Sequence, residues 1–425
     1  MLSANESVRA AYSETEQRAY EAKVAQGLYF PKITLTGRVT QLDDPIYLDL
    51  NPIRDAMLAL HPAVPASAVP SFKETIQDDT FWKSQLNMIW PVFSGGRIRA
   101  ANAAAEAGTR EANAKLRRTT ETLTSDLVRA YFAVRLAGQV VGVRTEAKDA
   151  LDRHLFEAHR MYEEGFIAQT ELLHAQVAQA QADRELKASR RDLELTYTAL
   201  SNVLSSDEPV APTTPLFLVS ALEPEENYVR QALDRHPALD QLDAIKDKTH
   251  ENLRAEKAAY SPEVYLFGVR ELYEHDLTVL EPAWAVGVGV SFTLFDGFAR
   301  PNRIDAAQKL EERAGLMRQK LARDLEALVS SKYQELMKAR EQFDALQTSL
   351  TFADENLRAR RLAFEEGLAT SLDVVDAQLS LSSVKVERLR AAYDFDIILA
   401  QLLEASGQGE EFPRYLVGAH MAVER

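Results

Sequence analysis

Residues 284–294 read WAVGVGVSFTL, and their even positions are all large and apolar. The odd positions carry only Ala, Gly, Ser and Thr. Alternation with a period of two predicts a β-strand that has one apolar face. Its length and pattern match a tilted strand of a membrane β-barrel, which needs roughly 9–11 residues. The same alternation also fits a half-buried strand of a soluble β-sandwich.

Three further segments pair with this strand to make two hairpins. Residues 262–272 precede it as its partner, and residues 31–40 and 81–93 are the weaker equivalents nearer the N-terminus. The predicted strand hairpins therefore lie at about 31–93 and 262–295. Four strands cannot close a barrel, and open sheet edges are not tolerated in lipid. If the strands lie in a membrane, several chains must contribute to one barrel.

The chain repeats itself, which sets its organisation. Residues 28–37 align with 259–268 at an offset of 231, and 93–95 align with 295–297 at an offset of 202. The second offset continues without a gap to 162–165 over 364–367. The first copy therefore carries an extra segment between residues 41 and 80. Its five prolines predict a loop with one short helix at 53–60.

The remainder of each copy is predicted to be a long helical hairpin. Residues 97–162 and 304–364 contain no proline, and each run could extend roughly 90 Å as an α-helix. Gly165 and Gly367 interrupt these runs, and return helices follow that end near 204 and 405. Apolar residues recur at alternating steps of three and four, as in a coiled-coil seam. They are Leu336, Ala339, Phe343, Leu346, Leu350, Ala353 and Leu357.

These signals divide the chain into two repeats of one unit. The first repeat covers 1–204, with a helix, the strand hairpin and a helical hairpin at about 97–204. A Pro-rich linker at 205–225 leads to the second repeat at 226–407, whose helical hairpin lies at about 301–405. Residues 408–425 form a C-terminal tail. At the offset of 231, Met1 falls inside the first helix, so we expect any signal peptide to be absent from this sequence.

Composition excludes several classes of function. The 49 basic and 64 acidic residues give a net charge of −15, which repels phosphate backbones, so no nucleic acid partner is expected. There is no cysteine, which excludes disulfides, thiolate zinc sites and cysteine nucleophiles. No hydrolase, phosphate-loop or metalloprotease motif occurs, and Gly287-Val288-Gly289 lies within a predicted strand. We therefore expect no enzyme activity, no cofactor and no metal site.

Three histidines occur near the first helical turn. His154, His159 and His174 have spacings of five and fifteen, which do not suit a shared helical metal site. We expect them to be surface histidines.

The order and spacing of these motifs resemble the TolC-like outer-membrane efflux proteins, over about residues 3–407. The resemblance rests on the Pro-initiated strands at Pro31 and Pro262, the strand exits at 93–97 and 295–297, and the glycine turns. It implies a mostly α-helical fold with membrane-spanning β-strands. Three chains would form a homotrimer, with a 12-stranded β-barrel in outer-membrane lipid continued by an α-helical barrel across the periplasm.

The same resemblance implies a function. The chain would be the outer-membrane channel of a tripartite efflux or type I secretion system. It would be a passive exit duct for substrates that an inner-membrane transporter and a periplasmic adaptor protein deliver. The alternative is a soluble coiled-coil structural or scaffolding oligomer, in which the hairpins form a small sheet. The alternation at 284–294 favours the channel, because a scaffold has no reason to face lipid.

The two glycine turns are the first candidate site. Glycine permits the positive φ of a tight reversal, and apolar residues follow it at each tip. These residues cap the hairpins in the simplest interpretation. The resemblance implies in addition that the tips contact the adaptor. The candidate contacts are Gly165, Phe166, Ile167, Gly367, Leu368 and Ala369.

Acidic residues beyond the second turn form the second candidate site. Asp373 and Asp376 are spaced i, i+3 and so share a helix face. Repeated around a trimer, they would form a carboxylate ring that favours cations at a pore mouth; the alternative is a solvated helix face. Thr170 and Glu171 lie at the equivalent stretch of the first copy and resemble the family's periplasmic gate.

One departure from the family concerns how that gate is held closed. Phe364 and Ala369 stand where the best-known members have a tyrosine and an arginine. The hydrogen-bonded lock of those members is therefore not expected in this chain.

Overall fold

The computed structural model describes residues 5–206, 210–219, 221–278, 280–417 and 421–422. Its chain divides into two compact units. The helical unit comprises Met1–Arg18, Thr109–Ile245 and Arg313–Arg425, and the sheet unit comprises Ala19–Gly108 and Lys246–Glu312. Part of the predicted linker (207–209 and 220) and part of the predicted tail (418–420 and 423–425) lie outside the described residues.

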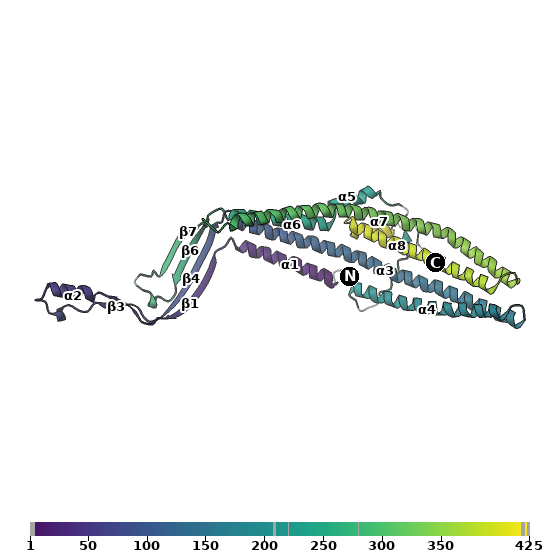
Figure 1. Ribbon diagram of the computed structural model, residues 1–425, viewed down its shortest axis with the longest axis horizontal. Coiled ribbons are helices and arrows are strands. Elements are labelled where there is room, and N and C mark those ends of the chain that lie inside the picture. The colour runs from purple at the N-terminus through teal and green to yellow at the C-terminus, as the bar shows by residue number, and fades with distance from the viewer. Residues whose placement is uncertain (1–4, 207–209, 220, 279, 418–420, 423–425) are drawn as a thin grey trace. The chain divides into compact units, whose positions relative to one another are not determined.

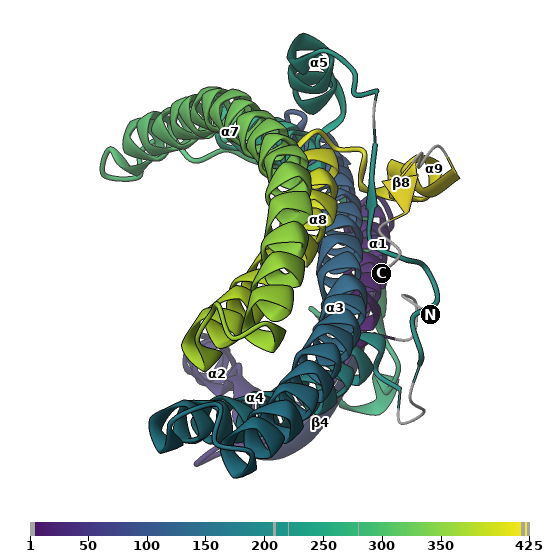
Figure 2. The same ribbon diagram turned by 90° about the vertical axis from the view of Figure 1, so that its right-hand side faces the viewer.

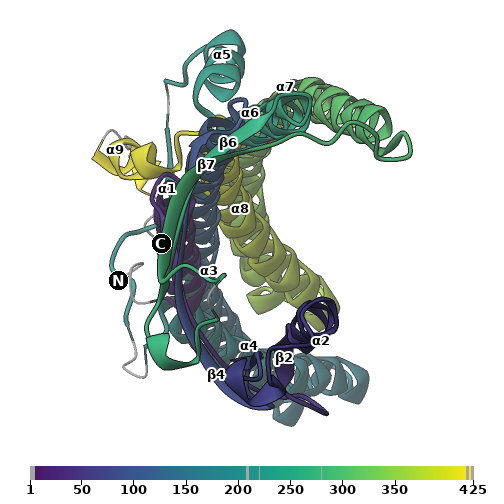
Figure 3. The same cartoon turned by 90° about the vertical axis from the view of Figure 1, so that its left-hand side faces the viewer.

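The sheet unit contains one four-stranded antiparallel sheet (Figures 1 and 3). Its strands are β1 (Lys32–Gln41), β4 (Thr80–Phe93), β6 (Glu263–Glu271) and β7 (Trp284–Ser291), in the order β1-β4-β6-β7. The predicted hairpins are both present. They join through β4 and β6, which come from different copies of the repeat.

One face of this sheet is apolar and exposed. Cross-strand partners such as Ile33 and Met88, or Leu266 and Val288, share this face. Its large exposed members are Ile33, Leu35, Val39, Trp82, Leu86, Trp90, Trp284, Val286, Val288 and Val290. The opposite face of β1 and β4 is polar, with Thr34, Thr36, Arg38, Gln85 and Asn87. The sheet is therefore amphipathic, as the alternation predicts.

Two glycines of β7 make room for aromatic rings on its polar face. A Cβ at Gly289 would lie 2.4 Å from Tyr265 Cζ, and one at Gly287 would lie 2.7 Å from Phe267 Cζ. The Gly287-Val288-Gly289 pattern thus has a packing role. The strand ends at Ser291, before the predicted Leu294, because Ser291 pairs with Glu263, the first residue of β6.

The extra segment of the first copy is more regular than the sequence indicates. The predicted short helix is present as α2 (Asn51–Leu60), with Pro52 in its first turn. On either side lie β2 (Ile46–Asp49) and β3 (Lys73–Gln77), which pair as an antiparallel ladder that the sequence analysis missed. A short 3₁₀ turn, η2 (Ala66–Ala68), lies between the helix and β3. The many prolines favour a loop, and the two strands are too short to give a periodic signal.

The helices repeat with the predicted offsets. Two 67-residue helices, α3 (Arg97–Glu163) and α7 (Ala299–Glu365), coincide at an offset of 202. The helices α1 (Glu6–Gly27) and α6 (Pro237–Ala258) coincide at an offset of 231. The return helices are α4 (Gln169–Leu204) and α8 (Ser371–Ala405). None of the helices among the described residues is long and apolar enough to cross a membrane.

Within the helical unit, α4 runs back along α3 and α8 runs back along α7 (Figure 2). The predicted seam is confirmed: Leu336, Ala339, Phe343 and Leu357 are buried. The other three seam residues are partly buried against the same apolar clusters. Packing of these seams, rather than helix propensity, stabilises helices of this length.

Shorter elements complete the core of the helical unit. The predicted linker contains β5 (Phe217–Leu218), which packs against α8 and pairs with β8 (Met421–Ala422). Leu216, Phe217 and Leu218 are almost fully buried, so this segment is part of the core. The remaining elements are α5 (Glu225–Arg235), α9 (Phe412–Val417), η3 (Glu274–Asp276, in the sheet unit) and η4 (Gly409–Glu411).

Candidate functional site

The two hairpin tips are built by the same turn. Gly165 and Gly367 have positive φ values of 79° and 71°. At the first tip, the Gly165 N–H bonds to the carbonyl of Tyr162 and the Phe166 N–H to that of Met161. Gly367 and Leu368 repeat this pattern at the second tip. This is a Schellman motif, in which glycine takes the left-handed position that other residues adopt at a cost.

The predicted tip residues divide into outward and inward pairs. Phe166 is 72% exposed and Leu368 is 83% exposed. Ile167 and Ala369 are instead partly buried against a cluster that includes Leu172, Leu357 and Phe364. Each tip therefore offers one large apolar side chain to solvent and holds the next one inside.

Asp373 has partners within its own helical hairpin. Its carboxylate accepts hydrogen bonds from the Thr370 N–H (2.9 Å) and hydroxyl (2.7 Å), and Thr370 Oγ1 accepts from the Asp373 N–H. This is a capping box at the start of α8. The hydrogen bonds from Thr370, together with Arg360 at 3.2 Å, hold the pKa of Asp373 below its usual value.

Asp376 lies one turn further along α8 and is exposed. Among the residues that the structure describes, it makes neither a hydrogen bond nor an ion pair. Of the two predicted gate carboxylates on α8, this one is therefore available to an ion, whereas Asp373 is occupied with the helix terminus.

Glu171 connects the two helical hairpins. Its carboxylate accepts a 2.7 Å hydrogen bond from the backbone N–H of Ser371, the first residue of α8. An acidic side chain at a helix N-terminus is favourable because it pairs with unsatisfied N–H groups and the positive end of the helix dipole. Thr170 is exposed in the first turn of α4. The structure thus brings Glu171, Thr370 and Asp373 together around one helix start, and leaves Thr170 outside this set.

His154 contradicts the expectation of a surface histidine. It is only 4% exposed, its Nε2 lies 2.8 Å from Ser371 Oγ, and its ring centroid lies 4.8 Å from that of Phe364. Burial, with the nearby charge of Arg361, lowers its pKa to about 4. Its position in a seam could have revealed this. Ala147, Leu151, His154 and Ala158 follow steps of four, three and four, and all are buried. His159 and His174 are exposed, as predicted.

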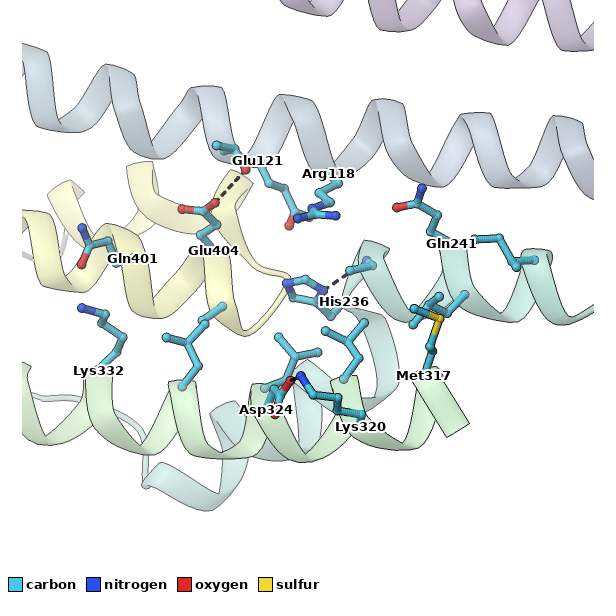
Figure 4. A pocket seen from close by; sticks show the side chains of 18 of the residues that line it. Arg118, Glu121, His236, Gln241, Met317, Lys320, Asp324, Lys332, Gln401 and Glu404 are labelled. Carbon is cyan, nitrogen blue, oxygen red and sulfur yellow. Dashed lines mark hydrogen bonds and ion pairs between the residues drawn. The ribbon is translucent and has the colours of Figure 1, made fainter. Parts of the chain in front are cut away.

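A cavity of about 740 Å³ lies elsewhere in the helical unit (Figure 4). Its lining residues come from α3, α6, α7 and α8 and carry charges of both signs. Burial raises the pKa of Glu121 to about 7, and Glu404 and Glu410 act in the same direction against Arg117. Burial also lowers the pKa of His236 to about 4. The described residues contain no cluster of three or more side chains that could hold a metal ion.

The chain is similar in sequence to several known proteins. The sequence profile described as outer membrane efflux protein matches residues 1–206 and 228–408. Protein CyaE of Bordetella pertussis is 23% identical over 76% of this chain and 70% of its own length. The cobalt-zinc-cadmium resistance protein CzcC of Cupriavidus metallidurans is 24% identical over 75% of this chain and 76% of its own.

A solved structure shares the fold. The outer membrane channel CmeC of Campylobacter jejuni superposes with a TM-score of 0.77 at 14% identity, covering 99% of this chain and 88% of that one. The four-stranded amphipathic sheet with paired long helices thus belongs to the same fold class as that structure. The profile match over most of the length makes the assignment specific. The chain belongs to the outer membrane efflux protein family, whose members are outer-membrane channels and not enzymes.

Proposed function

We propose that this chain forms, as a homotrimer, the outer-membrane exit duct of a tripartite efflux or type I secretion system. The observation that carries the proposal is the sheet. One of its faces is apolar and exposed. Its edge strands β1 and β7 each pair with a single strand among the described residues, so the outer edge of each is unpaired there. Backbone groups in hydrocarbon must be paired, so sheets from several chains have to join edge to edge. Three chains give a 12-stranded barrel around which outer-membrane lipid lies.

In this proposal the helices continue the duct into the periplasm as an α-helical barrel. The duct carries out no chemistry, and an inner-membrane transporter supplies the energy. The matched CzcC protein is named for resistance to three metals, which supports export as the use of such a duct. The soluble scaffold is set aside, since the chain belongs to an outer-membrane family.

The helical tips would receive a periplasmic adaptor protein. The exposed side chains of Phe166 and Leu368 support this, because a partner that covered them would remove large apolar surface from water. Gly165 and Gly367 would set the turn, and Ile167 and Ala369 would hold it against the core. Asp376, together with Asp373, Thr170 and Glu171, would form the gate.

We also propose that 1–204 and 226–407 are two structural repeats, each of which contributes residues to both compact units. The segment 205–225 joins them and 408–425 is an appended tail. The coincidence of α3 with α7 at one offset supports this division.

A cross-linking experiment tests the proposed assembly. The chain has no cysteine, so a pair placed at Thr36 on β1 and Ala285 on β7 is unique. In detergent, a bismaleimide should give a ladder that ends at three subunits, and light scattering should give about three times 47.5 kDa. Each single-cysteine variant is the control and should not form the ladder. A detergent-independent monomer or dimer would overturn the proposal.

A further inference from the structure

A second cavity of the helical unit, of about 580 Å³, differs from the one in Figure 4 in its charge balance. In the larger cavity, the basic residues Arg118, Arg129, Lys320 and Lys332 are nearly balanced by the acidic residues Glu121, Asp324 and Glu404. The charged residues that line the smaller one are Arg135, Lys385 and Arg388 against Glu146 alone. The smaller cavity therefore carries a positive excess, although the chain as a whole has a charge of −15.

Arg388 of α8 is the centre of this excess. Its guanidinium lies 4.5 Å from the centroid of the buried Phe343 ring. Its Nε is shielded from solvent and makes no hydrogen bond, and within the described part of the chain no carboxylate pairs with it. Burial lowers its pKa. A half-buried cation without a counter-charge is costly, so an anion at this place would be stabilised.

Two other basic residues, Arg135 and Lys385, line the same cavity. Arg135 of α3 donates from Nη1 to the carbonyl of Pro212 at 3.4 Å, while its Nε is also shielded and unpartnered. Lys385 is already neutralised by Glu146, at 2.7 Å. The uncompensated charge in the cavity is thus that of two guanidinium groups, the side chain best suited to hold carboxylate, sulfonate or phosphate oxygens.

Two glycines keep the cavity open. Gly138 and Gly142 lie one turn apart on α3, and no heavy atom comes within 4 Å of a Cβ built on either. Val143, Leu193, Leu350 and Leu389 add apolar surface to the lining, and Gln139 and Tyr197 add polar groups. The cavity therefore joins an apolar space to a cationic wall.

We propose that this cavity binds an amphipathic organic anion. The acidic headgroup contacts Arg388 and Arg135, and the apolar body lies in the space that Gly138 and Gly142 leave along α3. Neither the lipid-facing sheet nor the helical tips take part. The cavity therefore uses other residues than those proposed for the barrel sheet and for adaptor docking.

Calorimetric titration with 2-naphthoate tests the proposal on the full chain in a nonionic detergent, with protein-free micelles subtracted. The protein should bind 2-naphthoate, and the neutral 2-naphthamide at least tenfold more weakly. Arg388→Gln should weaken binding of 2-naphthoate at least tenfold. The matched control Arg390→Gln, an exposed arginine on the same helix, should leave it unchanged.

A second variant removes the space and keeps the charge. The Cβ that Gly142→Leu adds meets no heavy atom within 4 Å, and leucine has a higher helix propensity than glycine, so we expect the fold to be retained. It should abolish binding with a thermal midpoint no lower than that of wild type. The proposal is overturned if wild-type protein does not bind 2-naphthoate, or if Arg388→Gln and Gly142→Leu bind it as wild type does.

Discussion

Asp373 and Asp376 lie one turn apart on α8, but their surroundings assign them different roles. Asp373 closes the capping box with Thr370, whereas Asp376 is exposed. A substitution of Asp373 therefore perturbs a helix terminus in addition to any effect on ions. A substitution of Asp376 leaves the capping box intact, so it tests the effect on ions alone.

We predict that Asp376→Asn weakens the block of single-channel current by a trivalent cation such as La³⁺ about fivefold, without changing stability. In the proposed trimer, this variant would remove one exposed carboxylate per subunit from the proposed gate. Planar-bilayer recordings measure this. Asp192→Asn, which removes an exposed carboxylate from α4, is the control. Unchanged block in Asp376→Asn would remove this residue from the gate.

His154 gives the tips a dependence on pH. Its pKa is about 4 in the folded chain and ordinarily 6.5, so the unfolded chain takes up a proton first as the pH falls. Stability that is present at neutral pH is therefore lost between about pH 6.5 and pH 4.

We expect wild-type protein to lose about 2 kcal/mol more than His154→Gln between pH 7 and pH 4.5. Glutamine can retain a hydrogen bond to Ser371 but does not titrate. Unfolding midpoints across this pH range provide the measurement. His236, whose pKa is also lowered to about 4, contributes equally to both proteins. Parallel pH profiles of the two proteins would contradict the prediction.

At the scale of single residues, the sequence predicts where a side chain lies in its helix better than it predicts which groups that side chain contacts. The repeat predicts that Glu171 and Asp373 are equivalent, since they are 202 residues apart. Yet Asp373 caps its own helix and Glu171 caps the other hairpin's helix. The difference arises because the helix start equivalent to Thr370 has Ala168, whose side chain cannot cap. Such a contact between hairpins depends on tertiary packing, which no local spacing encodes.

At the scale of the element, the tip turns depend on backbone conformation. Gly367→Ala places a Cβ on a residue with a φ of 71° and should destabilise the helical unit by about 1 kcal/mol. Gly315→Ala is the matched control, because Gly315 lies inside α7 with open space around it. It should stabilise by up to about 1 kcal/mol. Thermal unfolding of both variants should shift in opposite directions.

The exposed tip side chains lead to a different expectation. Phe166→Ser with Leu368→Ser should abolish cross-linking to the proposed periplasmic adaptor, because it removes both of the proposed apolar anchors. Assembly and stability should be unchanged, since both side chains are exposed. Leu372→Ser, on an exposed side chain just inside α8, controls for a general loss of apolar surface. Normal adaptor cross-linking in the double variant would remove the tips from the docking surface.

Element existence follows well from the sequence, and element ends follow less well. The long helices and the hairpins have strong periodicity over many residues, so the pattern predicts them. β2 and β3 have too few residues for a periodic signal, and they pair across the turn that contains α2. β7 ends where its partner β6 begins, which is a property of pairing and not of its own composition.

At the scale of the whole molecule, the apolar sheet face should decide membrane assembly. We predict that Val288→Arg prevents recovery of the oligomer from the outer membrane, because a cation facing hydrocarbon costs about 2–4 kcal/mol in each subunit. Thr34→Arg, on the polar face, should assemble normally. Fractionation followed by gel analysis of unheated samples compares them. Equal assembly of both variants would place the apolar face away from lipid.

The equal lengths of α3 and α7 have an evolutionary consequence. Both have 67 residues, and their return helices have 36 and 35. An insertion in one helical hairpin alone would lengthen it relative to the other hairpin. Its tip would then extend beyond the other tip by about 1.5 Å for every residue added to each of its two helices. Natural insertions and deletions in the helices should therefore occur as matched sets in both copies. The segment between β1 and β4 is free of this constraint, and the first copy has lengthened there without the second.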